Sequence, residues 1–123
     1  MSSQADELMI IENLDGVHVV RLLTEALLDP MDVDRVEVEL QKLIAGDIEP
    51  RVVVALDTVD HLSSLMIGVL IKLRAQVAAK KGEICLAAVP ARLQSLFDVV
   101  KLSDVFETYA TTQAAVLALK TPG

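Results

Sequence analysis

The chain has 123 residues, the length of a single domain with one hydrophobic core. Its formal net charge of −7 argues against binding to a nucleic-acid phosphate backbone, and an aromatic content of 2% leaves few side chains on which bases could stack. No apolar run is long enough to span a membrane, the first residues do not resemble a signal peptide, and the single cysteine, Cys85, excludes an intramolecular disulfide. The composition therefore predicts a globular cytoplasmic protein.

The first part of the chain predicts a β-hairpin followed by an amphipathic helix. Strand-like runs at residues 8–12 and 17–23 flank Asp15-Gly16, a dipeptide that is typical of tight hairpin turns. Asp29-Pro30 then supplies an N-cap and a first helical residue, and apolar residues recur at helical spacing as far as Gly46.

The middle of the chain predicts a buried strand and a second helix. Residues 52–56 are a continuous apolar run, which favours a central strand that is covered on both faces. Ser63 and Ser64 follow where a helix would begin, because serine oxygens accept hydrogen bonds from the free N–H groups of a first helical turn. The helical pattern continues to Gly82. A serine at a helix start just beyond a central strand is a common place for a site in an α/β protein.

The last third of the chain continues the alternation of strands and helices. It predicts a strand at residues 83–88, a helix from Pro90, a short strand within residues 102–108, and a last helix capped by Thr111 or Thr112. Alternating strands and helices imply a mostly parallel sheet, because a helix lies in each right-handed crossover.

We therefore predict one α/β domain over residues 1–123, with residues 1–7 disordered. It would have a mixed, mostly parallel sheet and four helices in the order β-β-α-β-α-β-α-β-α. The charge is uneven, because residues 1–60 carry −10 and residues 61–123 carry +3. This asymmetry reflects either solvated helix faces or a basic second half that attracts an acidic partner toward the serines.

Residues for catalysis are sparse in this sequence. His61 lies near Ser63 and Ser64 and follows Asp57 and Asp60, so the residue types of a Ser–His–Asp site are present, but residues so close in one turn rarely reach triad geometry. No Gly-X-Ser-X-Gly sequence surrounds the serines, no cysteine and histidine spacing suits zinc, and no glycine-rich loop could hold a phosphate. We predict a non-enzymatic protein with no catalytic residue, no cofactor and no metal. Helix capping, worth about 1 kcal/mol, is the alternative role for Ser63 and Ser64.

The order of elements and several local sequences resemble the STAS family, which comprises sulfate-transporter C-terminal domains and bacterial anti-sigma factor antagonists. The family has an apolar strand ending in Asp, then Asp-Ser-Ser-Gly-Leu-Gly at the start of an amphipathic helix. A helix ended by Gly, an apolar strand and a Leu-Phe pair follow. The matching segments are Leu56-Asp57, Leu62-Ser63-Ser64, Ile67-Gly68-Val69-Leu70, Lys81-Gly82, Ile84–Ala87 and Leu96-Phe97 through Val105-Phe106. The resemblance covers nearly the whole chain.

This resemblance implies a regulatory binding domain that works by partner switching. In that scheme an unphosphorylated antagonist binds an anti-sigma factor that is a serine kinase of the GHKL type. The kinase phosphorylates the antagonist and a phosphatase resets it. Alignment on Ile67-Gly68 places Ser64 at the phosphorylated position, whereas alignment on the serine pair places Ser63 there. The implied partner contacts are Asp57, His61, Leu62, Ser63 and Leu65.

The chain departs from the family at Ser63-Ser64-Leu65-Met66, where an acidic residue and small residues are usual. A second hypothesis is therefore a constitutive STAS scaffold subunit of a transport or sensory complex. In that case the serines only cap the helix, and Ser64→Ala costs about 1 kcal/mol. A third hypothesis is a small hydrolase that uses Ser64. We expect no nucleic-acid partner, no membrane insertion, and a monomer or weak homodimer.

Overall fold

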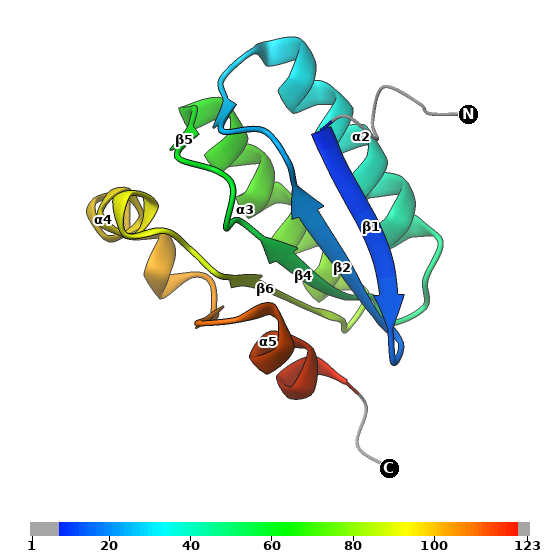
Figure 1. Cartoon of the computed structure of the whole chain (residues 1–123). Coiled ribbons are helices and arrows are strands. Elements are labelled where there is room, and N and C mark those ends of the chain that lie inside the picture. The colour runs from blue at the N-terminus through cyan, green and yellow to red at the C-terminus, as the bar shows by residue number, and fades with distance from the viewer. Residues whose placement is uncertain (1–7, 121–123) are drawn as a thin grey trace.

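A five-stranded sheet forms the centre of the computed structural model, which describes residues 8–120 (Figure 1). Its strand order is β1-β2-β4-β6-β7, with β1 antiparallel to β2 and every other neighbouring pair parallel. The strands are β1 (Met9–Leu14), β2 (Val17–Leu22), β4 (Arg51–Ala55), β6 (Glu83–Ala87) and β7 (Thr108–Tyr109). The predicted α/β class and the mostly parallel sheet with one antiparallel edge are confirmed.

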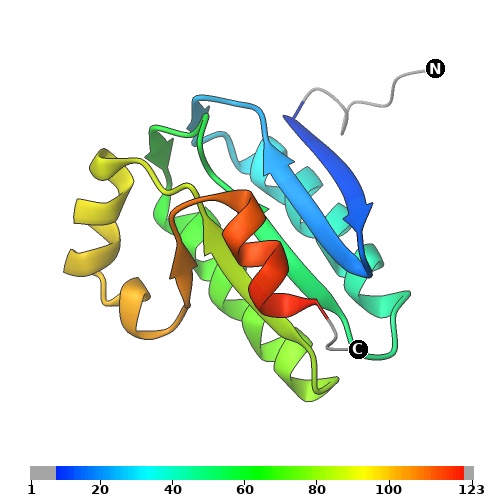
Figure 2. The ribbon, with the colours of Figure 1, turned by 60° about the horizontal axis from the view of Figure 1, so that its bottom comes forward.

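Helices cover both faces of the sheet. The described residues contain α2 (Pro30–Ala45), α3 (Ser64–Ala79), α4 (Ala91–Val99) and α5 (Thr112–Leu119). Figures 1 and 2 show α2 and α3 together on one face and α5 on the other. Two apolar clusters fill the layers, a large one under α2 and α3 and a smaller one under α5. The four predicted helices are confirmed.

The opening hairpin has the tight turn that its sequence predicts. Asp15 and Gly16 have φ angles of 56° and 85°, so both central residues are left-handed, as a type I′ turn requires. Leu14 pairs with Val17, and the register continues without interruption to Met9 opposite Leu22. Because this turn matches the strand twist, the hairpin forms a regular edge of the sheet.

The central strand β4 is buried on both faces. Val52 and Val54 belong to the cluster under α2 and α3, while Val53 packs in the cluster under α5. Alternate side chains of a strand point to opposite faces, so a continuous valine run fills both layers. The next residue after the strand, Leu56, is also fully buried, and the chain then turns toward the start of α3.

A small second sheet was not predicted. β3 (Ala26–Leu27) and β5 (His61–Leu62) pair in parallel, and the N–H groups of Asp60 and His61 both donate to the carbonyl of Glu25, at 2.7 and 3.0 Å. Two-residue strands are too short to produce a visible alternation in the sequence. This sheet ties the segment before α2 to the segment before α3.

The strand expected within residues 102–108 lies later than predicted. Residues Leu102–Asp104 form a short 3₁₀ helix, and the strand β7 begins only at Thr108. Leu102 and Phe106 are 1% and 4% exposed. Asp104 lies between them and is exposed, whereas a strand would place residues 102, 104 and 106 on the same face. The predicted disorder of residues 1–7 concerns residues outside the described part.

Candidate functional site

The two serines occupy different positions at the start of α3. Ser63 has extended backbone angles, φ −78° and ψ 160°, and is the N-cap residue. Its Oγ accepts a hydrogen bond from the N–H of Met66 at 3.1 Å, and its own N–H donates to the carbonyl of Leu27 at 3.1 Å. Ser63 is therefore held by the cap on one side and by the second sheet on the other.

Ser64 is the first residue of α3 and is exposed to solvent. Within residues 8–120 its hydroxyl makes no hydrogen bond. The expectation that Ser64 caps the helix is wrong, because the cap hydrogen bond belongs to Ser63. A hydroxyl at the first helical position lies beside the free N–H groups of the first turn, where the helix dipole favours a negative charge.

The other predicted contact residues lie in unlike environments. Leu65 is 51% exposed and the His61 side chain is exposed, so both can meet a partner. Leu62 is only 7% exposed and packs in the core, which removes its side chain from any contact surface. The Asp57 carboxylate lies 3.6 Å from Nε of Arg21, in an ion pair directed toward the hairpin.

No hydrogen bond joins His61 to Asp57 or to either serine among the residues that the structure describes. The three residue types of a Ser–His–Asp site are thus close in sequence but are not connected in the fold. The other histidine, His18, lies in β2, where its Nε2 is 3.0 Å from Oδ2 of Asp47. This hydrogen bond is the main cause that holds the pKa of the Asp47 carboxyl below its usual range.

One exposed residue beside the serines was missed by the sequence analysis. Leu28 is 51% exposed. Leu28 follows Leu27 of β3, whose carbonyl binds the N–H of Ser63, so the parallel pairing places Leu28 next to the start of α3. The only sequence signal was a second leucine just before the Asp29-Pro30 helix start, which the short strands obscured.

Gly68 lies one turn after Ser64 on the same exposed side of α3. A Cβ atom added at Gly68 would meet nothing within 4 Å. A glycine inside a helix costs about 1 kcal/mol relative to alanine. No contact within residues 8–120 requires a residue without a side chain at this position. The packing of the chain itself therefore gives no reason for a glycine here.

We define the α3 face as the exposed group formed by Leu28, Ser64, Leu65, Gly68 and Ile71. Three of its members are apolar side chains that are about half exposed: 51% for Leu28, 51% for Leu65 and 46% for Ile71. Its centre combines a hydroxyl with a glycine, so a partner surface can approach the helix closely there. These exposed apolar side chains make the α3 face a candidate surface for binding another protein.

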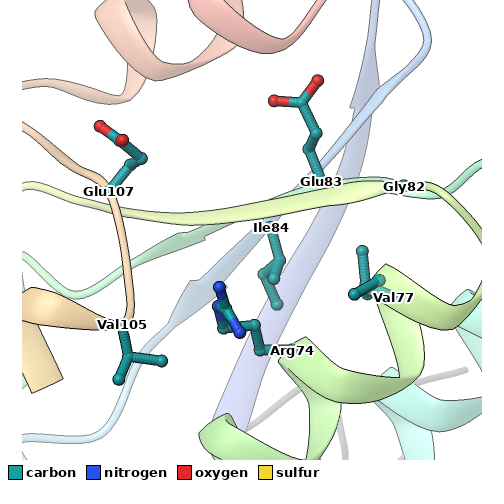
Figure 3. A pocket seen from close by; sticks show the side chains of 8 residues that line it. Arg74, Val77, Gly82, Glu83, Ile84, Val105 and Glu107 are labelled. Atoms are coloured by element: carbon teal, nitrogen blue, oxygen red, sulfur yellow. The ribbon is translucent and has the colours of Figure 1, made fainter.

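A separate hollow lies away from the serines. It has a volume of about 190 Å³ and lies between the second half of α3, β6 and residues 105–107 (Figure 3). Arg74, Ile84 and Val105 line its α3 side, while Glu83 and Glu107 point toward α5. Its lining shares no residue with the α3 face, and we assign it no function.

The fold and the exposed serine together define a class of protein domain. It is a small α/β domain with helices on both faces of a mixed sheet and an exposed serine at the helix start after the central strand. The model of the STAS domain family matches residues 9–115, and the chain belongs to this family. The resemblance noted in the sequence is confirmed.

Solved structures share this fold. An anti-sigma factor antagonist from Mycobacterium paratuberculosis is 21% identical, with a TM-score of 0.79 over 92% of this chain and 93% of that chain. The Bacillus cell fate determinant SpoIIAA in its phosphorylated form is 17% identical, with a TM-score of 0.69 over 89% of this chain and 97% of that chain. A sulfate transporter family protein from Wolinella succinogenes is 11% identical, with a TM-score of 0.69 over 89% of this chain and 88% of that chain. At these identities the likeness shows the fold alone.

No curated protein sequence matches the chain. Across residues 8–120, no helix has the length and apolar character needed to cross a membrane. The same residues contain no group of three or more histidine, cysteine, aspartate or glutamate side chains placed to hold a metal ion.

Proposed function

We propose that the chain is a regulatory binding domain of the anti-sigma factor antagonist type, switched by phosphorylation of Ser64. The observation that carries this proposal is the contrast between the two serines. The Ser63 hydroxyl is engaged as the helix cap, whereas the Ser64 hydroxyl is exposed and has no partner in the described residues. A kinase can therefore reach Ser64 without opening the start of α3.

The physical effect of a phosphate at Ser64 is opposite for the free domain and for a complex. Phosphorylation adds roughly −1.5 to −2 charge at pH 7. In the free domain the helix dipole tolerates this charge, and α3 has no acidic residue in its first turn to repel it. In a complex that buries Leu65 and Leu28, the phosphate adds a desolvation cost and repels any acidic group nearby. The fold should survive while the affinity falls.

Gly68 supports the same binding surface. A helix that keeps a glycine with open space around it gives up stability that alanine would supply. Close approach of a partner backbone to the Ser64–Gly68 stretch accounts for this choice. The named neighbours also support the proposal, because they include an anti-sigma factor antagonist and a protein solved in its phosphorylated form. We propose a serine kinase of the GHKL type and an opposing phosphatase as partners, in the cytoplasm.

The test compares binding and folding in a set of variants. The binding partner is the kinase recovered from the protein's own cells with a tagged chain. Ser64→Asp should lower its affinity by at least about tenfold, or about 1.4 kcal/mol, while circular dichroism stays unchanged. Ser64→Ala should bind like the parent chain but accept no phosphate. Ser95 is an exposed residue of α4. Ser95→Asp adds the same charge away from the α3 face and should not alter binding. Equal affinity of Ser64→Asp and the parent chain would contradict the proposal.

A constitutive scaffold subunit of a transport complex remains the second candidate. It is favoured by the sulfate transporter family protein among the structural neighbours and by Ser63, which stands directly before Ser64 where the family usually has an acidic residue. In this case Ser64 variants with intact folds would all assemble equally well. Finding no phosphate on the chain in growing or stressed cells would support it over the switch.

A further inference from the structure

β1 forms an exposed edge of the sheet with unusually little protection. It is the outermost strand, and within residues 8–120 no strand pairs with its outer side (Figure 1). Its six residues pair with β2 in one unbroken register, without a bulge. Proteins usually protect such edges with proline, lysine, bulges or very short strands. β1 has none of these and carries one charge, on Glu12.

The hydrogen-bonding groups that face outward can be assigned from the hairpin. The N–H of Leu23 donates to the carbonyl of Leu8 at 2.7 Å, and Leu14 and Val17 flank a two-residue turn. Polar groups alternate in direction along an antiparallel strand, so the even-numbered residues bond to β2. The backbone N–H and C=O groups of Met9, Ile11 and Asn13 therefore point outward.

Apolar side chains surround these outward groups. Ile11, on the α2 face of the sheet, is 38% exposed. On the opposite face Ile10 and Leu14 are 45% and 42% exposed, because α5 packs over β2, β4, β6 and β7 and leaves β1 open. The edge thus combines unpaired backbone groups with apolar side chains on both of its faces.

We propose that β1 pairs with β1 of a second copy of this chain, in an antiparallel arrangement centred on Ile11. The two sheets would then join into one continuous sheet of ten strands, with the two-fold axis passing through the Ile11 pair. The edge is self-complementary in this register, which identifies the second copy as its occupant.

The register follows from charge and overlap. Centring on Ile11 pairs Met9 with Asn13 of the other copy and places Glu12 opposite Ile10, so every outward N–H meets an outward C=O. Centring on Glu12 would set two carboxylates against each other, and like charges directly opposite are destabilising. Centring on Ile10 would leave Asn13 without a partner. Only the Ile11 register pairs all three outward-facing residues without setting two carboxylates directly opposite each other.

The dimer should be weak and should not cover the α3 face. Pairing of single strands buries less than the roughly 800 Å² per partner of a standard interface, and each copy carries a net charge of −7. Because β1 and its copy run antiparallel, the two Ser64 residues lie at opposite ends of the joined sheet. The dimer would therefore offer two independent binding sites and should form whether or not Ser64 is phosphorylated.

Sedimentation velocity of the full chain from micromolar to millimolar concentration tests the proposal. We expect a concentration-dependent dimer that is lost in Ile11→Lys, which places two cations on the axis, and is kept in Val99→Lys. Val99 is 78% exposed and belongs to α4, which Figure 1 shows beyond the edge of the sheet opposite β1. Added salt should tighten this dimer, since it screens the repulsion between two acidic copies. A dimer that salt weakens, or a monomer throughout, would overturn the proposal.

Disulfide trapping gives a second readout that does not depend on the stability of Ile11→Lys. Opposite residues in a hydrogen-bonded antiparallel pair have Cα atoms about 5.5 Å apart, within the range of about 4.4–6.8 Å that disulfides span. Ile11→Cys should therefore form a covalent dimer under mild oxidation, whereas Val99→Cys should not. The native Cys85 is buried and should not interfere. Equal cross-linking of both variants would show random collision and count against the dimer.

Discussion

Gly68→Ala separates what stabilises the domain from what its partner needs. Gly68 lies on the exposed side of α3, one turn after its first residue, and an added Cβ would have open space. Alanine should therefore stabilise the free domain by about 0.8–1.0 kcal/mol, the difference between the two residues in a helix interior. With an m-value near 2 kcal/mol/M in urea, the midpoint should rise by about 0.4–0.5 M.

The same substitution should weaken the complex. If a partner backbone packs against the Ser64–Gly68 stretch, a methyl group there forces the two surfaces apart, and we expect an affinity loss of about tenfold or more. Urea unfolding monitored by circular dichroism gives the stability, and isothermal titration calorimetry with the captured kinase gives the affinity. Gly82→Ala is the opposite case, because a Cβ there would collide with the carbonyl oxygen of Pro50. The same change from glycine to alanine should therefore destabilise the domain at position 82, by about 1–3 kcal/mol.

Two results would refute this reasoning. A Gly68→Ala variant that is no more stable than the parent would mean that residue 68 is not in a regular, open helix. A variant that is more stable but binds equally well would mean that no partner approaches this part of α3 closely. In the second case Gly68 would no longer support the proposed binding surface.

Three further predictions concern single residues. Ser63→Ala should destabilise the domain by about 1 kcal/mol in urea unfolding, because the cap hydrogen bond to Met66 is lost. Ser64→Ala should change the stability by less than about 0.5 kcal/mol. Equal losses in the two variants would contradict the assignment of Ser63 as the cap. The lowered pKa of the Asp47 carboxyl contributes stability at neutral pH, and this stability is lost as the pH falls below the ordinary carboxyl pKa of 3.8. The stability of Asp47→Asn should therefore depend less steeply on pH in this range than that of the parent chain, as acid unfolding would show. Burial raises the pKa of the Cys85 thiol to about 12. Ellman's reagent near pH 8 should therefore label this thiol only after the chain unfolds. Fast labelling of the folded chain would contradict the burial of Cys85.

Much of the fold could be predicted because each main element has a strong local signal. The valine run of β4 predicts a buried strand. Asp15-Gly16 predicts the hairpin turn, because both residues tolerate left-handed backbone angles. Asp29-Pro30 marks the start of α2, where the Asp29 side chain accepts from the N–H of Met31 at 2.8 Å. Local propensity and tertiary packing agree at these positions.

The remaining features depend on contacts between distant residues. The pairing of β3 with β5 joins segments about 35 residues apart through a few backbone hydrogen bonds, which leave no periodic pattern. That pairing places Leu28 beside the serines and removes Leu62 from the surface. The roles of Ser63 and Ser64 could not be separated either, because a shift of one residue in the helix start exchanges cap and first helical residue.

The most direct test of the account is the modification state of Ser64 in the protein's own cells. A tagged chain is captured, and trypsin releases residues 52–72 as one peptide that contains Thr58, Ser63 and Ser64. The account predicts phosphate on Ser64, with an anti-sigma kinase bound more to the unphosphorylated than to the phosphorylated chain. An unmodified peptide under all conditions, together with transporter or sensor subunits that bind Ser64→Asp as tightly as the parent chain, would contradict it.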